Sequence, residues 1–77
     1  MLFHPMNGTV IRSDSASAVK EAFSQRYNVD YVREGFLSGV FGSIYHVYLN
    51  DGHHLTVYVE KKNNWLGEET YIKHVDE

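Results

Sequence analysis

The sequence predicts a small α+β protein in which one N-terminal helix packs on a mainly antiparallel sheet, in the order β-α-β-β-β. Three observations lead to this fold class: an amphipathic segment with helical period, a β-hairpin closed at Asn50-Asp51-Gly52, and a C-terminal segment rich in β-formers. The 77 residues form one domain over 1–77. A chain of this size buries only roughly 60% of the surface that its unfolded form exposes, so each large apolar side chain matters to the core.

The first expected strand is Thr9–Arg12. It follows Asn7-Gly8, a dipeptide that readily adopts the positive φ angles of a tight turn. Leu2-Phe3 could pair with this strand across the turn. Pro5 lacks an N–H group and would confine that first arm to a sheet edge.

The segment 15–27 is the expected helix. The side chains of Ser13-Asp14-Ser15 offer oxygen acceptors for the free N–H groups of a first helical turn. Asn28 suits the C-terminal end. One apolar stripe runs along the segment and would face the sheet, formed by Val19, Ala22, Phe23 and Tyr27.

Residues 29–36 favour a short strand, because Tyr31 and Val32 prefer extended backbone. Glycines interrupt the next residues, 35–42, and predict a turn or loop. This loop carries four large apolar side chains, Phe36, Leu37, Val40 and Phe41. They either complete the small core or form an exposed contact patch.

The hairpin is expected over about residues 43–60, and two registers are possible. A two-residue loop of Asp51-Gly52 mixes apolar and polar side chains on both faces. A three-residue loop with Gly52 in the left-handed position separates them and is preferred. It gives an apolar face of Tyr45, Val47, Leu49, Leu55, Val57 and Val59, and an amphipathic face of Ile44, His46, Tyr48, His54, Thr56 and Tyr58.

After the hairpin, residues 61–64 are predicted to form a polar connection that leads to Trp65. Glu69–Val75 is predicted to be the last strand. A helix is the alternative for this segment, because Tyr71, Ile72 and Val75 also share a helical stripe. Gly67 and the β-branched residues favour the strand.

Composition narrows the functional classes. The net charge is −3 and the chain has no cysteine, so neither a disulfide nor a thiolate zinc site is available. The basic residues form no cluster beyond Lys61-Lys62, which argues against a groove for nucleic-acid phosphates. The sequence has neither a signal peptide nor an apolar span, so we expect a soluble protein that is cytoplasmic by default and acts away from membranes.

We expect no enzymatic activity and no cofactor. Ser43 and His46 lie three residues apart on a strand and therefore point to opposite faces, so they cannot form a nucleophile–base pair. The glycine-punctuated segment lacks the Lys-Ser/Thr of a phosphate-binding loop.

The five histidines raise the question of a metal site. In the preferred register His46 and His54 are diagonal neighbours on one face of two paired strands, and their backbones lie within about 7–8 Å of each other. They could share a zinc ion if His4 or a carboxylate completed the shell. The same residues could instead confer a response to pH between about 5 and 7.

The leading hypothesis for function is a small non-enzymatic protein-binding module, such as an inhibitor or an adaptor, that acts through the aromatic sheet face and the apolar glycine-rich loop. Its partner would be another protein or a second copy in a homodimer. Tyr and Trp are the usual anchors of protein interfaces, and 14% of the residues are aromatic. The expected contact residues are Phe36, Leu37, Phe41, Ile44, Tyr48, Tyr58 and Trp65. A histidine-based metal or pH-sensing domain is one alternative, and a single-stranded nucleic-acid binder that stacks bases on tyrosines is another.

Overall fold

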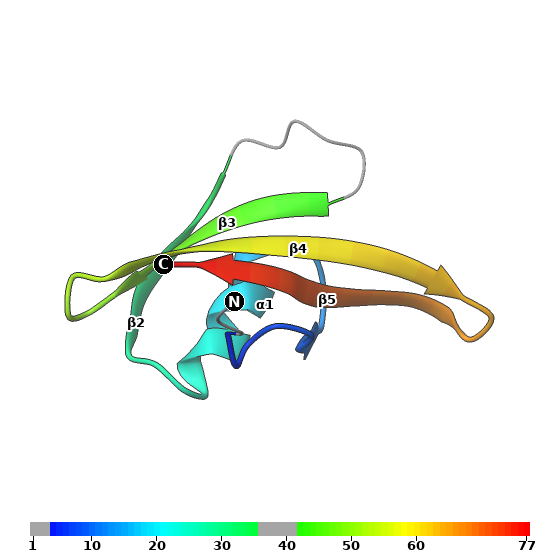
Figure 1. Cartoon of the computed structure of the whole chain (residues 1–77), viewed down its shortest axis with the longest axis horizontal. Coiled ribbons are helices and arrows are strands. Elements are labelled where there is room, and N and C mark those ends of the chain that lie inside the picture. The colour runs from blue at the N-terminus through cyan, green and yellow to red at the C-terminus, as the bar shows by residue number, and fades with distance from the viewer. Residues whose placement is uncertain (1–3, 36–41) are drawn as a thin grey trace.

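The residues that the structure describes form an α+β domain, as predicted, with one helix and a five-stranded antiparallel sheet (Figure 1). Their order along the chain is β-α-β-β-β-β, which has one strand more than the predicted β-α-β-β-β. The structure, a computed structural model, describes residues 4–35 and 42–77. The strand order in the sheet is β1-β5-β4-β3-β2. Along the chain the elements are β1 (Val10–Ile11), α1 (Ala16–Ser24), β2 (Val29–Glu34), β3 (Gly42–Leu49), β4 (His54–Asn64) and β5 (Gly67–Asp76).

The helix begins where the capping residues predict it. The Ala18 N–H donates to Ser15 Oγ over 3.2 Å, which satisfies one of the free donors of the first turn. The helix ends at Ser24, three residues earlier than expected, and Arg26 and Tyr27 both donate to the carbonyl of Phe23 in a closing turn. The predicted apolar stripe is correct, since Val19 and Phe23 are fully buried against the sheet.

The three-residue loop of the central hairpin is confirmed. Gly52 has a φ of +92°, and the Leu49 N–H donates to the His53 carbonyl over 2.9 Å. Val47 then pairs with Leu55, and Tyr45 pairs with Val57. The face predicted to be apolar is therefore the face that α1 covers, and we call it the inner face.

The core lies between the inner face and α1. The strands β3, β4 and β5 supply most of it, and the helix and the N-terminal segment close it. Its buried members are Met6, Ile11, Ala18, Val19, Phe23, Tyr45, Val47, Leu49, Leu55, Val57, Val59, Ile72 and Val75.

The last two strands are longer than predicted. Residues 61–64, expected to be a polar connection, continue β4, and β5 begins at Gly67. The C-terminal segment is a strand and not a helix, as predicted. Past Gly42 at the start of β3, residues 62–69 pair only with each other among the described residues, and they form a two-stranded arm that extends from the sheet (Figure 1).

The N-terminal region differs in part from the prediction. The first strand is only two residues long, and Val10 pairs with Tyr71 of β5. The expected strand over 29–36 ends at Glu34. Leu2 and Phe3, which were expected to form a first arm, lie outside the described residues.

A partly buried polar contact ties the start of the helical region to the sheet. Asp14, just before α1, accepts hydrogen bonds from Ser43 Oγ and from the Tyr45 hydroxyl, each over 2.6 Å. Tyr45 is only 2% exposed. Its burial, followed by the hydrogen bond to Asp14, raises the pKa of the Tyr45 hydroxyl well above the ordinary value of a tyrosine.

We expect this raised pKa to make the protein sensitive to alkali. The pKa is higher in the folded than in the unfolded chain, so the stability that it contributes is complete below about pH 10. It is lost as the pH rises from there toward the folded-state pKa. Urea unfolding between pH 8 and 11 should show a free energy that falls above pH 10.

The Tyr45→Phe variant tests this cause directly. Its free energy of unfolding should fall less steeply above pH 10 than that of the wild type, because it has no buried hydroxyl to ionise. Tyr31→Phe, which alters an exposed ring, is the control and should keep the wild-type slope. Equal slopes in Tyr45→Phe and the wild type would contradict the explanation.

Candidate functional site

The face of the sheet opposite α1, which we call the outer face, carries rings and histidines. No other described helix or strand packs on it, because α1 makes its contacts on the inner face. Its position is the one predicted from the hairpin register. Its members from β2 to β5 include Tyr31, Ile44, His46, Tyr48, His54, Tyr58 and His74.

Four of these rings form a continuous row across three strands, which we call the ring row. Tyr31 stacks on Tyr48 with centroids 4.5 Å apart, and Tyr48 stacks on His54 at 4.7 Å. His54 in turn lies 5.1 Å from His46. Stacking of this kind orients each ring through its neighbours.

Tyr31 joins the row because of a β-bulge. Val29 pairs with Leu49, but Tyr31 pairs with Tyr48, so Asp30 is an extra residue in β2. The extra residue turns Tyr31 to the outer face and Val32 to the inner face. Tyr31 is not among the contact residues predicted from the sequence, because simple alternation along β2 does not indicate the bulge.

The outer-face residues predicted for protein binding are only partly accessible. Ile44, Tyr48 and Tyr58 lie on this face, as expected, and all three are half-buried among their neighbours. Tyr58 lies beside His74, with centroids 5.8 Å apart. Of the ring row, Tyr31 at the edge is 44% exposed. The outer face is thus an ordered aromatic surface with limited free area.

The two histidines predicted to be neighbours do come together. His46 Nδ1 and His54 Nε2 are 3.0 Å apart, so one ring donates a hydrogen bond to the other. Gly35 leaves the space that the His46 ring needs, since a Cβ atom there would lie 2.9 Å from His46 Nε2. His54 is exposed and His46 is half-buried.

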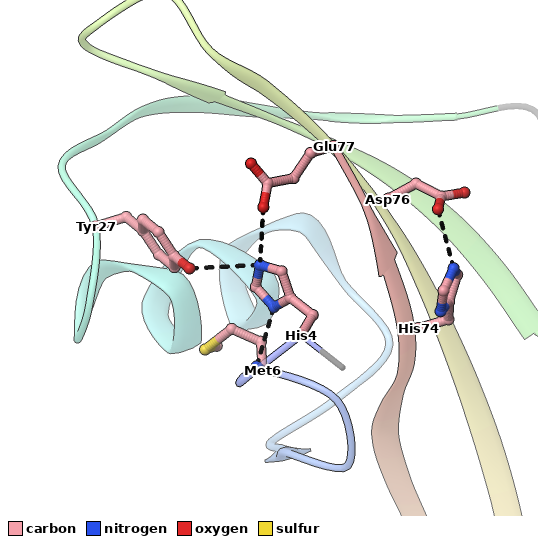
Figure 2. A network of polar contacts seen from close by, with 6 residues as sticks. All are labelled: His4, Met6, Tyr27, His74, Asp76 and Glu77. Carbon is pink, nitrogen blue, oxygen red and sulfur yellow. Dashed lines mark hydrogen bonds and ion pairs between the residues drawn. The ribbon is translucent and has the colours of Figure 1, made fainter. Parts of the chain in front are cut away.

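The other histidines lie elsewhere, and His4 does not complete a metal shell. Figure 2 shows His4 beside Tyr27 and Glu77, with its Nδ1 accepting from the Met6 N–H over 3.0 Å. The ring proton is then on Nε2, which lies 3.4 Å from the Tyr27 hydroxyl and 3.9 Å from a Glu77 carboxylate oxygen.

His74 pairs with Asp76 over 3.0 Å, also in Figure 2, and His53 lies 3.5 Å from Asp51. Across residues 4–35 and 42–77, no three or more His, Asp or Glu side chains gather as a metal-binding group. A shell of three or four protein ligands, as the zinc hypothesis required, is therefore not formed by these residues.

The tip of the arm carries the two most exposed large apolar side chains among the described residues. Trp65 and Leu66 form the two-residue turn between Asn64 and Gly67, and they are 91% and 77% exposed. The Leu66 N–H donates to Asn64 Oδ1 over 2.9 Å, and Gly67 has a φ of +129°, so the turn has a defined geometry. Trp65 was predicted as a contact residue, but its place at a hairpin tip was not. The signal in the sequence that could have indicated this turn is the pair Asn64 and Gly67, which flank Trp65 and Leu66.

Three of the predicted contact residues, Phe36, Leu37 and Phe41, lie outside the described residues. Ser43 is bonded to Asp14 on the inner side, away from His46, as the strand geometry required. Among the described residues, no helix has the length and apolar character needed to cross a membrane.

The chain matches no protein-family model, no curated protein and no solved structure. No family membership therefore assigns a ligand to the outer face or to the arm.

Proposed function

We propose that this chain is a non-enzymatic protein-binding module that inserts the tip of its arm into a pocket of another protein. The observation that supports this most directly is the exposure of Trp65 and Leu66, at 91% and 77%, on the end of a paired two-stranded arm. A convex tip of this kind fits a concave surface. Blocking or bridging such a pocket is how a small inhibitor or adaptor would act.

The energetics favour the tip over the outer face as the anchor. Burying an exposed tryptophan removes about 150–250 Å² from water. At ~25 cal/mol per Å² this is about 4–6 kcal/mol before the entropy costs of association. The tip is already ordered by the Asn64 side chain and by strand pairing, which reduces those costs. The half-buried Tyr48 and Tyr58 have less area to offer.

Charge favours a protein over a membrane or a nucleic acid as the partner. The arm carries one lysine, Lys62, and two glutamates, Glu68 and Glu69. Anionic lipid surfaces and phosphate backbones attract clusters of basic residues. A slightly acidic arm with an apolar tip lacks that attraction.

The edge strand β2 is a less suitable contact. It is the outermost strand on its side of the sheet and carries Asp30, Arg33 and Glu34, together with the bulge at Asp30. Charged residues and bulges are the features by which proteins prevent pairing at sheet edges. Strand addition by a partner is therefore not the proposed mode.

Site-specific photocrosslinking tests the proposal. A photoreactive phenylalanine analogue at position 65 should capture one protein from the source cells, while the same analogue at Lys20 on α1 should not. Lys20 is exposed and lies on the helix, away from the arm. Equal capture at both positions would contradict a specific tip contact.

We expect Trp65→Ala to weaken binding of the purified captured protein by roughly 30-fold or more, since interface hot spots contribute at least about 2 kcal/mol. Val10→Ala, a truncation of another exposed apolar side chain, should change the affinity less than twofold. Isothermal titration gives both values.

Two results would count against the proposal. An affinity that does not change in Trp65→Ala would exclude the tip as the anchor. Sedimentation equilibrium that shows a dimer of the wild type and a monomer of Trp65→Ala would replace the partner protein by a second copy of the chain.

A further inference from the structure

We propose that His46 and His54 form a two-ligand site for a divalent transition-metal cation of the Cu²⁺, Ni²⁺ and Zn²⁺ class. This site lies on the outer face and uses no residue of the arm, so it is independent of the protein-binding proposal. Its chemistry rests on the convergence of two imidazole nitrogens on neighbouring strands.

The distance between the two nitrogens suits a shared ion. His46 Nδ1 and His54 Nε2 are 3.0 Å apart. Metal–imidazole bonds of about 2.0–2.1 Å at a tetrahedral or square-planar angle place two ligand nitrogens about 2.9–3.4 Å apart. The pair therefore needs little separation. The ring that donates the hydrogen bond must carry its proton on its other nitrogen instead, and both rings must rotate until their two lone pairs point toward the ion. His54 is exposed and has room for that rotation.

The surroundings hold both rings near this position. His54 stacks on Tyr48 with centroids 4.7 Å apart, and Tyr48 stacks on Tyr31. The absence of a side chain at Gly35 makes space for the His46 ring. A pair of ligands held in place before binding loses less conformational entropy when the ion arrives.

The ligand type selects the class of ion. Two neutral imidazoles without a carboxylate suit Cu²⁺, Ni²⁺ and Zn²⁺, whereas Mg²⁺ and Ca²⁺ prefer oxygen ligands. The same chemistry predicts the tightest binding for Cu²⁺. Water fills the remaining coordination positions, because no third ligand residue among those described joins the pair.

Two-dimensional NMR with CuCl₂ below one equivalent tests the site. Paramagnetic Cu²⁺ should broaden the amide signals around His46, Tyr48 and His54 before the rest of the spectrum. In titrations with NiCl₂ and ZnCl₂, the ions should bind at the same place and more weakly than Cu²⁺. MgCl₂ at the same concentration should leave the spectrum unchanged.

Substitutions of single histidines test whether Cu²⁺ binds to His46 and His54. His46→Gln and His54→Gln should each lower the Cu²⁺ affinity at least tenfold. His53→Gln is the matched control and should keep the wild-type affinity, because His53 is the neighbour of His54 in sequence but lies beside Asp51. Circular dichroism checks that each variant keeps the fold.

Either of two results would overturn the proposal. One is broadening that is centred away from the outer face, for instance near His4 or His74. The other is a Cu²⁺ affinity that His54→Gln leaves within threefold of the wild type while the variant remains folded.

Discussion

The Leu55→Ala variant is expected to lose about 2–5 kcal/mol of its free energy of unfolding, which is most or all of the stability of a domain this small. Leu55 is 2% exposed and lies on the inner face opposite Val47. Removing its side chain leaves a cavity in a core that has few other residues to fill it. A thermal melt followed by circular dichroism should show a midpoint at least roughly 10 °C lower, or no folded baseline at all.

Leu66→Ala provides the matched comparison. It makes the same substitution at a leucine that is 77% exposed at the tip of the arm. Its free energy of unfolding should stay within about 0.5 kcal/mol of the wild type. If both variants lost similar stability, the assignment of Leu55 to the core, and with it the hairpin register, would be wrong.

The second large effect is expected from Asp14→Ala, which should cost about 2–3 kcal/mol. Asp14 accepts from two hydroxyls, and the substitution would leave the buried Tyr45 hydroxyl without its partner. The contact also joins the residue before α1 to β3, so its loss releases one attachment of the helical region to the sheet. Urea unfolding at neutral pH measures the change.

A double-mutant cycle with Tyr45→Phe separates the hydrogen bond from other effects of the substitution. In the Tyr45→Phe background, which has no hydroxyl at residue 45 to leave unpaired, Asp14→Ala should cost at least about 1 kcal/mol less than in the wild type. Costs that simply add would show that Asp14 acts through something other than Tyr45. Ser15→Ala, which removes the helix cap next to it, is a useful comparison at an expected cost of about 1 kcal/mol.

Much of the fold could be predicted from residue types alone. The alternation along β3 and β4 separates apolar from polar side chains only in the three-residue register, and the structure has that register. The helix was found through the spacing of Val19 and Phe23 and through its serine cap. These signals are local, because each depends on residues that are near each other in the chain.

The arm could not be predicted from local sequence signals. Residues 61–64 are lysines and asparagines, which rarely indicate a strand. They are extended because each pairs with a residue of β5, such as Asn63 with Glu68. Strand pairing supplies the order that their side chains do not favour. The exposure of Trp65 follows from this pairing and could not be predicted without it.

The histidine pair of the outer face could also be predicted only in part. The approach of His46 to His54 follows from the hairpin register and was expected. The sequence did not indicate that His4 lies away from this pair, because the position of His4 depends on its contacts with Tyr27 and Met6 across the inner side of the fold. Contacts between distant segments are fixed by packing, which single-sequence patterns do not describe.

The bulge at Asp30 makes β2 tolerant of a change in length at that one position. Removing this one residue would restore simple alternation with Val29 still opposite Leu49, Tyr31 opposite Tyr48 and Val32 opposite Val47, so Tyr31 and Val32 would keep their faces. Exchanging Asp30 for another polar residue would leave both side chains where they are. For this segment an alignment gap at residue 30 is therefore no more serious a change than a mismatch, and a chain one residue shorter at that position would keep the aromatic surface.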